Sequence, residues 1–458
     1  MLYWYLINTM IDIFERVKAN NPWWTQPKVI EDDSLLLEFE MQKFRYYHPL
    51  INSLPLNKDA VLTLRGPRRV GKSTLIRLLI KRLLLEEKIP KEAVFFYPCD
   101  RVKDFDNLFE IIKTYLDFAR PRTDSRLFIF LDEISFVKDW QRAVKEMKDA
   151  GLLNKSLLLL TGSSILDLKF GSEFLSGRRG ISSSDIFYYP LSFKDFVRLI
   201  NPQILVDKNP FTLSYHLPQL NKLMSDFLIT GGFPNTINEF YTLGRIENST
   251  YETLLTWLEN DIHKTKRSEN TALDLMENIL RTLTTPVSFT SLAKDSLLAS
   301  HYAVQEYLDI LEKMFILFPI NAFLVEQKKR DPKKNKKIYF TDPFIFNAVY
   351  LKSVQLMEDP FAQNQKIIDA NRDRLAENTV AAALKKTYPS LFWGKMKKGE
   401  IDFVTKKEGK LSYFEVKYRE KIDYSKIPLL TGISLISKKT LMEKPVKTIP
   451  LEIFLLSI

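Results

Sequence analysis

Residues 66–74, GPRRVGKST, form the motif that most restricts what this chain can fold into. The apolar run VLTL at 61–64 precedes the motif, and LIRLLIKRLLL follows it with apolar residues at helical spacing. A strand, a GxxxxGK[ST] loop and a helix in this order make up the phosphate-binding loop of nucleotide-binding α/β domains. The motif therefore predicts a buried strand that leads directly into a nucleotide site.

The residue types of this loop explain the chemistry that it predicts. Gly66 and Gly71 let the backbone wrap so that its N–H groups point inward, where the positive end of the following helix adds to them. Lys72 is expected to reach the β- and γ-phosphates, and the Ser73 hydroxyl to ligate Mg²⁺. The cofactors predicted are ATP and Mg²⁺. The predicted nucleotide-binding residues are Gly66, Pro67, Arg68, Arg69, Val70, Gly71, Lys72, Ser73 and Thr74.

A second apolar run, LFIFL at 127–131, predicts another buried strand, and it ends in Asp132 and Glu133. An acidic pair at the tip of a buried strand is costly unless a cation meets it. We expect Asp132 to hold Mg²⁺ beside the nucleotide, and Glu133 to act as the catalytic base for the attacking water. The alternative is that the pair caps a helix.

Two further segments carry groups that suit a triphosphate. After the run SLLLL at 156–160 comes TGSS, where Ser163 either contacts the γ-phosphate or belongs to a turn that caps a helix. In SGRRG, at 176–180, Arg178 either stabilises charge on the γ-phosphate or forms a surface pair with Arg179.

The order of apolar runs predicts the architecture of this half of the chain. Strands near 61–64, 93–97, 127–131 and 156–160 alternate with helical patterns, which is typical of a parallel α/β layer. The stretch from Pro190 to His263 is mostly helical in period and is interrupted by GGFP. We interpret it as a helical lid over the nucleotide.

The middle of the chain has the element order of a winged helix: two short helices from Ser288, capped in part by Ser300, then a β-hairpin. The hairpin tip, 326–337, holds seven Lys or Arg and two acidic residues. It either lies against phosphates, with binding that falls steeply with salt, or is a solvated hairpin end. The second helix offers no Arg for a guanine edge, so sequence-specific reading of DNA has weak support.

The C-terminal part carries carboxylates on a predicted helix, 371–386, and on two predicted strands, 400–404 and 411–418. Because side chains alternate along a strand, Glu415 and Lys417 share one face, and they converge with Asp402 if the two strands pair as a hairpin. Neighbouring carboxylates repel unless a cation neutralises them, and both Lys417 and Mg²⁺ can do so. The alternative is a solvated strand face. The predicted metal ligands are Glu377, Asp402 and Glu415, with Glu400 as a further candidate, and the predicted catalytic residues are Asp402, Glu415 and Lys417.

Several motifs resemble a widespread prokaryotic family that joins an AAA-type P-loop ATPase to a C-terminal domain of unknown function. They occur in the family's order and are GPRRVGK, FIFLDE, TGSS, SGRRG, GGFP and Asp261-Ile262. The segment NPWW at 21–24 and Asp342-Pro343 look more like the archaeal branch, and the similarity covers nearly the whole chain after residue 20. The resemblance implies ATP hydrolysis and a restriction-endonuclease-like C-terminal core. In such nucleases the D…ExK carboxylates hold Mg²⁺ at the scissile phosphate, and the Lys positions or deprotonates water.

Composition argues against several other classes of protein and of site. A single cysteine, Cys99, rules out an intramolecular disulfide framework, and four scattered histidines argue against a zinc site, so a catalytic metal is expected among oxygen ligands. The formal charge of +11 and the pI near 9.2 suit a nucleic-acid partner or simply solubility. No apolar stretch reaches the roughly 20 residues of a membrane span, and the first residues lack the features of a signal peptide, so we expect no membrane partner and a cytoplasmic location.

These patterns lead to a hypothesis for the whole chain, an α/β protein in five parts. The leading hypothesis is a Mg²⁺-dependent ATPase that binds nucleic acid and can cleave it at the D…ExK site. The nucleic acid expected is DNA. The alternative is an ATP-controlled switch or regulator whose C-terminal domain binds DNA or a protein without catalysis. The sequence leaves open whether the chain forms a homo-oligomer. The parts are an N-terminal strap at 1–55, a P-loop ATPase core at 56–190, the lid at 191–268, the winged helix at 269–350 and the nuclease-like domain at 360–458.

Overall fold

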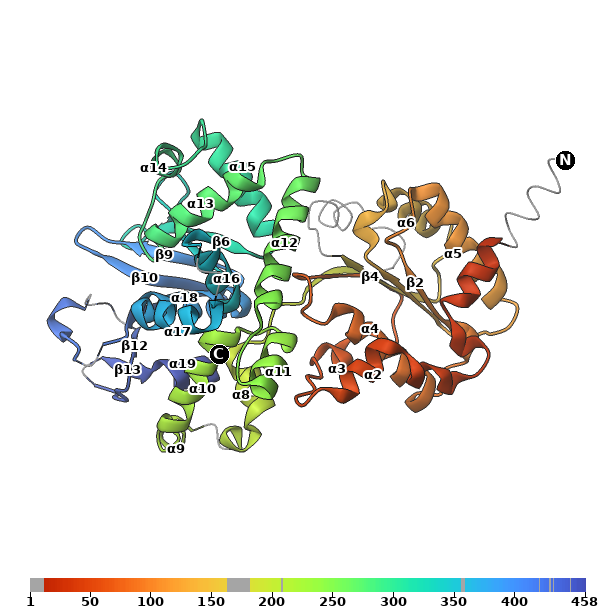
Figure 1. The fold of residues 1–458 in the computed structure, drawn as a ribbon, viewed down its shortest axis with the longest axis horizontal. Coiled ribbons are helices and arrows are strands. Elements are labelled where there is room, and N and C mark those ends of the chain that lie inside the picture. The colour runs from red at the N-terminus through yellow and green to blue at the C-terminus, as the bar shows by residue number, and fades with distance from the viewer. Residues whose placement is uncertain are drawn as a thin grey trace. The chain divides into compact units, whose positions relative to one another are not determined.

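The computed structural model describes residues 12–162, 182–206, 209–355, 359–419, 421–427, 430, 432–444 and 446–458. The chain divides into two compact units, Met1–Tyr188 and Tyr189–Ile458 (Figure 1). Within the described ranges, no helix combines the length and the apolar character that crossing a membrane requires.

A five-stranded parallel sheet forms the centre of unit 1, in the order β2-β3-β4-β1-β5. The four predicted strands are confirmed, and the side chains of β1, β3 and β4 are buried along their whole length because each is an apolar run between two helical layers. The parallel α/β layer expected from the sequence is therefore correct. The strands are β1 (Ala60–Arg65), β2 (Val94–Pro98), β3 (Leu127–Asp132), β4 (Ser156–Gly162) and β5 (Ser182–Phe187).

Helices cover both faces of this sheet. Figure 1 shows α5 and α6 on one side and α2, α3 and α4 on the other. The fold places the start of α4 directly after the loop that follows β1, at the carboxyl edge of the sheet, where parallel α/β sheets bind ligands. The helices are α2 (Ser34–Met41), α3 (Leu50–Ser53), α4 (Lys72–Lys81), α5 (Phe105–Ala119) and α6 (Trp140–Asp149).

The NPWW segment covers the edge strand β2 of this sheet. The Asn21 side chain donates to the Phe96 carbonyl oxygen at 3.0 Å and accepts from the Phe96 N–H at 2.7 Å. Both indole N–H groups, of Trp23 and Trp24, donate to the carbonyl oxygen of Val94 at 3.0 and 2.9 Å. Both rings are buried, with 1% and 7% exposed. The aromatic segment thus packs against the edge strand and satisfies backbone groups that this strand otherwise exposes.

Unit 2 combines many helices with one mixed sheet. Among them, α14 and α15 follow the predicted helix pair of the winged helix, and Ser300 caps α15 by accepting from the Ala303 N–H at 3.2 Å. The helices are α8 (Phe193–Ile200), α9 (Pro210–Ser214), α10 (Leu217–Thr230), α11 (Pro234–Leu243), α12 (Asn248–Lys264), α13 (Glu269–Thr282), α14 (Phe289–Lys294), α15 (His301–Lys313), α16 (Pro343–Ser353), α17 (Pro360–Ala370), α18 (Arg372–Thr387) and α19 (Leu451–Ser457).

The sheet of unit 2 has the order β13-β12-β11-β10-β9-β6-β7, and β8 pairs with β6 beside this path. Strands β9, β10 and β11 are antiparallel, whereas β11, β12 and β13 are parallel. The parallel pairing of β6 with β9 joins the predicted winged-helix hairpin to the C-terminal strands in one sheet. The strands are β6 (Leu317–Leu324), β7 (Lys329–Asp331), β8 (Lys337–Phe340), β9 (Leu391–Lys395), β10 (Glu400–Lys407), β11 (Lys410–Lys417), β12 (Ile433–Ser437) and β13 (Lys447–Pro450).

The GGFP turn and the Asp342-Pro343 segment are hydrogen-bonded to each other inside unit 2. The Asp342 carboxylate accepts from the Gly232 N–H at 2.8 Å and from the Phe344 N–H at 2.9 Å, where it caps α16. A Cβ on Gly232 would lie 2.2 Å from the carbonyl oxygen of Leu191, so only glycine fits there. The helices from 191–268 pack within unit 2, with α10 against α16, α17 and α19, and their role as a lid stays a prediction.

Candidate nucleotide site and carboxylate cluster

The phosphate-binding loop has a backbone conformation and a close backbone contact that require glycine. Gly71 has a φ of 101°, and it immediately precedes Lys72, the first residue of α4. A Cβ on Gly66 would lie 2.1 Å from the carbonyl oxygen of Tyr188. Lys72 is 5% exposed, and its Nζ donates to the carbonyl oxygens of Gly66 at 2.9 Å and Pro67 at 2.8 Å. The ammonium group therefore lies inside the loop, at the amino end of a helix that favours anions.

Tyr188 lines this loop, although no sequence pattern selected it. Its N–H donates to the carbonyl oxygen of Arg65 at 2.6 Å, and its ring stacks on His48 with 4.1 Å between ring centroids. A Cβ on Gly71 would lie 3.5 Å from its hydroxyl oxygen. Burial raises the pKa of Tyr188, so the hydroxyl keeps its proton at neutral pH. Tyr188 thus closes one side of the loop with a neutral group.

Asp132 connects the loop to the neighbouring strands. The Ser73 hydroxyl donates to Asp132 Oδ2 at 2.7 Å, and the Thr161 hydroxyl donates to Oδ1. Thr161 Oγ1 in turn accepts from the Glu133 N–H at 3.1 Å, and Glu133 has a left-handed backbone with φ 54°. The structure therefore brings together Ser73, Asp132 and Glu133, as the sequence predicts. It adds Thr161, which belongs to the predicted TGSS segment.

This arrangement fits Mg²⁺. Asp132 is buried, with 8% exposed, and its carboxylate is held by two hydroxyl groups. A hydroxyl can rotate and offer a lone pair to a metal without leaving a charge behind, and carboxylate and hydroxyl oxygens are ligands that Mg²⁺ prefers. Two predicted contributors, Ser163 and Arg178, lie outside the described residues, and their roles stay predictions.

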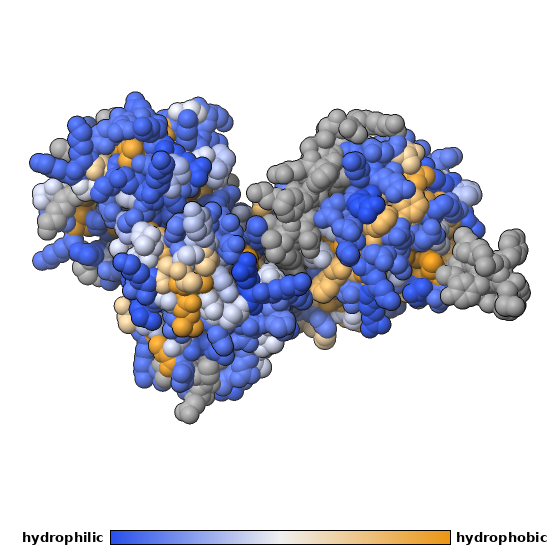
Figure 2. All heavy atoms as spheres, turned by 90° about the horizontal axis from the view of Figure 1, so that it is seen from above, coloured by the Kyte–Doolittle hydropathy of each residue, from blue (hydrophilic) through white to orange (hydrophobic). Residues whose placement is uncertain are grey.

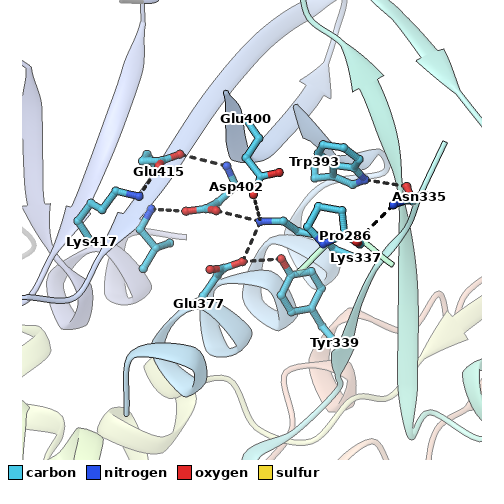
Figure 3. Close-up of polar contacts among 11 residues, drawn as sticks. Pro286, Asn335, Lys337, Tyr339, Glu377, Trp393, Glu400, Asp402, Glu415 and Lys417 are labelled. Carbon is cyan, nitrogen blue, oxygen red and sulfur yellow. Dashed lines mark hydrogen bonds and ion pairs between the residues drawn. The ribbon is translucent and has the colours of Figure 1, made fainter. Parts of the chain in front are cut away.

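The predicted D…ExK residues also come together, in unit 2 (Figure 3). Strands β10 and β11 pair antiparallel, as the sequence predicts. The Asp402 N–H donates to Glu415 Oε2 at 3.1 Å, and the Val416 N–H donates to Asp402 Oδ2 at 2.9 Å. Lys417 Nζ lies 2.5 Å from Glu415 Oε1. Each carboxylate is thus hydrogen-bonded to the opposite strand.

Lys337 is the central cation of this cluster, whereas the sequence predicts it among the lysines of the exposed hairpin tip. That prediction is wrong for this residue, because Lys337 is the first residue of β8 and only 1% exposed. Its Nζ lies 2.9 Å from Asp402 Oδ1 and 3.2 Å from Glu377 Oε1. Strand alternation puts Lys337 on the same face as Tyr339, which also reaches the cluster by donating to Glu377 Oε1 at 2.7 Å.

Burial and neighbouring charge shift the pKa values within the cluster. Burial, assisted by Asp402, raises the pKa of Glu377 to about 7, against the effect of Lys337 and Tyr339. Burial by itself lowers the pKa of Lys337, but the carboxylates outweigh it and the net shift is upward. Burial and Asp402 likewise raise the pKa of Glu415, and Lys417 opposes them. Lys337 is therefore fully charged at neutral pH.

This cluster does not fit Mg²⁺. Within the described ranges, no group of three or more His, Cys, Asp and Glu side chains is arranged to hold a metal ion. The Lys337 ammonium is within hydrogen-bonding distance of both Asp402 and Glu377, where a bridging metal would have to bind. A divalent ion about 4 Å from an ammonium group is repelled by roughly 8 kcal/mol at an effective dielectric constant of about 20.

Exposed basic residues gather at one end of the same sheet. Leu324 on β6 pairs with Lys329 on one side and with Lys395 on the other, so the β6–β7 turn and the β9–β10 turn are neighbours. The Lys397 N–H confirms this by donating to Glu326 Oε1 at 2.9 Å. Hydrophilic side chains cover most of the face of each unit that Figure 2 shows. The exposed basic residues of this end, named here the basic edge, are Lys328, Lys329, Arg330, Lys333, Lys334, Lys395, Lys397 and Lys398.

Comparisons with known proteins find three family matches along the chain. Residues 58–197 match the AAA domain family, and residues 221–356 and 372–442 match two domains of unknown function, DUF8612 and DUF4143. An uncharacterized protein of Haemophilus influenzae is 24% identical over 374 residues, 79% of this chain and 83% of its own. An uncharacterized protein of Methanocaldococcus jannaschii is 23% identical over 400 residues, 84% and 80% respectively. One relative is bacterial and the other archaeal, so kinship with the archaeal branch stays a prediction.

Solved structures show only distant likeness. The Aeropyrum pernix ORC1 protein in complex with DNA has a TM-score of 0.30 at 14% identity, over 74% of this chain and 97% of that one. The Thermotoga maritima RuvB Holliday junction branch migration motor has a TM-score of 0.26 at 16% identity, over 60% and 83%. The assignment therefore depends on the loop, the sheet and the family match. Together they show a phosphate-binding loop on a parallel α/β sheet in unit 1, within a stretch, residues 58–197, that resembles the AAA domain family.

Proposed function

We propose that the protein is a Mg²⁺-dependent ATP hydrolase that uses ATP to control a nucleic-acid-binding unit 2. The observation that carries the first part is the hydrogen-bonded series from Ser73 through Asp132 and Thr161 to Glu133. It supports a metal-binding role for the oxygens of Ser73 and Asp132 and a catalytic role for Glu133, whose backbone lies at the same edge of the sheet as the phosphate-binding loop.

The residues of this site divide the work of hydrolysis. The loop N–H groups and the end of α4 bind phosphate oxygens, and Lys72 exchanges the carbonyl oxygens of Gly66 and Pro67 for those of the β- and γ-phosphates. Ser73 and Asp132 would hold Mg²⁺, which neutralises charge on the phosphates. Thr161 fixes the backbone of Glu133, and the Glu133 carboxylate accepts a proton from the attacking water.

Phosphate release tests this part. Wild-type protein is expected to hydrolyse ATP with Mg²⁺, and Lys72→Ala is expected to lower the rate by about 10²–10³-fold, because it removes a charge that stabilises the transition state. Lys113→Ala, on the outside of α5 and paired with Asp117 at 2.8 Å, serves as the control and should keep the wild-type rate. An unchanged rate in folded Lys72→Ala contradicts the assignment of the site.

The basic edge supports the second part of the proposal. It joins exposed lysines and an arginine from two turns that are far apart in sequence but adjacent in the sheet. Such a row can neutralise several phosphates of one backbone and release their counterions. It does not depend on base-specific contacts, which agrees with the absence of an arginine on helix α15.

For the C-terminal part we propose a restriction-endonuclease-like core that binds nucleic acid without cleaving it. The antiparallel β9-β10-β11 group, the parallel β12 and β13, and Glu377 on α18 support this kind of core. Cleavage at the D…ExK residues has less support, because the Lys337 ammonium lies between the carboxylates. Of the two sequence hypotheses, the cluster thus favours the ATP-controlled switch over the nuclease.

Binding of fluorescent duplex DNA at increasing salt tests the basic edge. The affinity is expected to fall steeply with salt, and Lys329→Gln/Arg330→Gln should reduce the slope of log K against log[salt] by about 0.9 for each phosphate that the variant leaves unneutralised. The double variant Lys113→Gln/Lys138→Gln removes the same charge from unit 1 and should keep the slope. A flat salt titration contradicts the proposal.

A further inference from the structure

We propose that Lys337 takes the place of a divalent metal ion in the carboxylate cluster of unit 2, so that this cluster is complete without metal. The proposal concerns unit 2 alone and does not depend on ATP hydrolysis in unit 1. Its first support is position: the ammonium group bridges Asp402 on β10 and Glu377 on α18, at 2.9 and 3.2 Å (Figure 3). Glu400 adds a third carboxylate at 3.8 Å.

The hydrogen bonds of the cluster give the second support. Asp402 Oδ1 accepts from Lys337 and Oδ2 from the Val416 N–H. Glu415 Oε1 accepts from Lys417 and Oε2 from the Asp402 N–H. Glu377 Oε1 accepts from both Lys337 and the Tyr339 hydroxyl. Five of these six carboxylate oxygens therefore already bind a protein donor, whereas Mg²⁺ requires several oxygens at about 2.1 Å in octahedral geometry.

The third support is that Lys337 cannot simply move away. It is 1% exposed at the start of β8, where Ile320 is its partner on β6, and Trp393 Nε1 donates to the carbonyl oxygen of the nearby Asn335 at 3.1 Å. To reach water, this buried ammonium group would have to break its contacts with Asp402 and Glu377. Leaving Asp402 and Glu377 without a cation would also be costly.

Lys337 lies outside the D…ExK residues in sequence and comes from the hairpin that precedes α16. In a metal-dependent site the motif supplies the ligands and solvent supplies the ion. Here another segment of the same chain supplies the positive charge. The cluster then acts as a permanent link between β8, α18 and β10, because an ammonium group on the chain cannot dissociate.

Binding of Mn²⁺, measured without nucleotide from the electron paramagnetic resonance signal of the free ion, tests the proposal on the full chain. Wild type and Asp402→Asn are expected to bind the same number of Mn²⁺ ions. An additional ion that wild type binds and Asp402→Asn does not would overturn the proposal. This comparison uses no variant of Lys337 and so decides the question even where those variants are unstable.

A gain of binding provides the complementary test. Lys337→Met is expected to create one Mn²⁺ site that the double variant Lys337→Met/Asp402→Asn lacks. Lys336→Met is the matched control, because the Lys336 ammonium bonds to the carbonyl oxygens of Pro332 and Lys334 instead of to the cluster, and it should bind as wild type does. Folded Lys337→Met with no added site would count against a position shared by lysine and metal.

Discussion

Asp132 in unit 1 and Asp402 in unit 2 are buried to the same degree, with 8% and 7% exposed, yet they have opposite partners. Hydroxyl groups of Ser73 and Thr161 hold Asp132, whereas the Lys337 ammonium and a backbone N–H hold Asp402. In the proposed function, these neutral donors leave the charge of Asp132 available to a cation that arrives with a ligand. The charge of Asp402 is already neutralised by the chain itself. We infer from the comparison that the partners of a buried carboxylate, more than its burial, indicate whether it serves a ligand or the fold.

The largest effect is expected from breaking the charge pair in unit 2. Lys337→Met should lower the free energy of unfolding by about 3–5 kcal/mol, because it leaves buried carboxylates without their cation. Urea unfolding followed by circular dichroism measures this, with Lys336→Met as a neighbour that should stay close to wild type. If Lys337→Met is as stable as wild type, Asp402 is no more committed to the fold than Asp132, and the comparison fails.

The next effect is a dependence of stability on pH that comes from Glu377. Its pKa rises to about 7 in the folded protein from an ordinary value of 4.5. The folded state then binds the proton more tightly than the unfolded state, so stability falls as the pH rises from about 4.5 to about 7, by roughly 3 kcal/mol. Glu377→Gln removes the titrating group.

Unfolding free energies at pH 5 and pH 7.5 check this sign. The difference between the two pH values should be smaller in Glu377→Gln than in wild type. Equal differences in the two proteins would mean that Lys337 and Tyr339 hold Glu377 ionised throughout, and the cluster would then be more fully paired than the comparison assumes.

The smallest effect on stability is expected in unit 1. Thr161→Val keeps the shape of the side chain and removes two hydrogen bonds, one to the charged Asp132 carboxylate and one from the Glu133 N–H, at a cost of about 2 kcal/mol. The same change should slow ATP hydrolysis measurably, because the Glu133 N–H loses its acceptor. Thermal unfolding and phosphate release together check the prediction. Lost stability with an unchanged rate would make Thr161 part of the fold alone.

Local patterns predicted most of unit 1 and part of unit 2. The apolar runs of β1 to β4 and the glycine loop have short-range signatures, so their positions and the meeting of Ser73 with Asp132 follow from sequence. The β10–β11 hairpin was also predictable, because each strand alternates and a glycine turn separates them. Hydrophobic period and turn residues are properties of a single segment, and they are read without knowing the partner.

The features that sequence missed depend on partners distant in the chain. Strand β5 has the sequence SSSDIF, which is largely polar and does not resemble a strand of a parallel sheet, and it is a strand through its pairing with β1. Lys337 ends a run of lysines that is typical of a solvated hairpin tip. Its burial depends on the pairing of β8 with β6. The alternation of side chains in KIYF could have indicated that Lys337 and Tyr339 share one face of a strand. No sequence pattern indicated the place of Tyr188 beside the phosphate-binding loop.

The pairing of β6 with β9 has a practical consequence for anyone who shortens this protein. A fragment of 360–458 would keep Glu377, Asp402 and Glu415 but lose Lys337, and it would expose β9 as a new sheet edge. Such a fragment would offer an artificial acidic pocket to metal ions. Any metal-stimulated nicking by it would then be an artefact of truncation, and only the intact polypeptide can report what this region does.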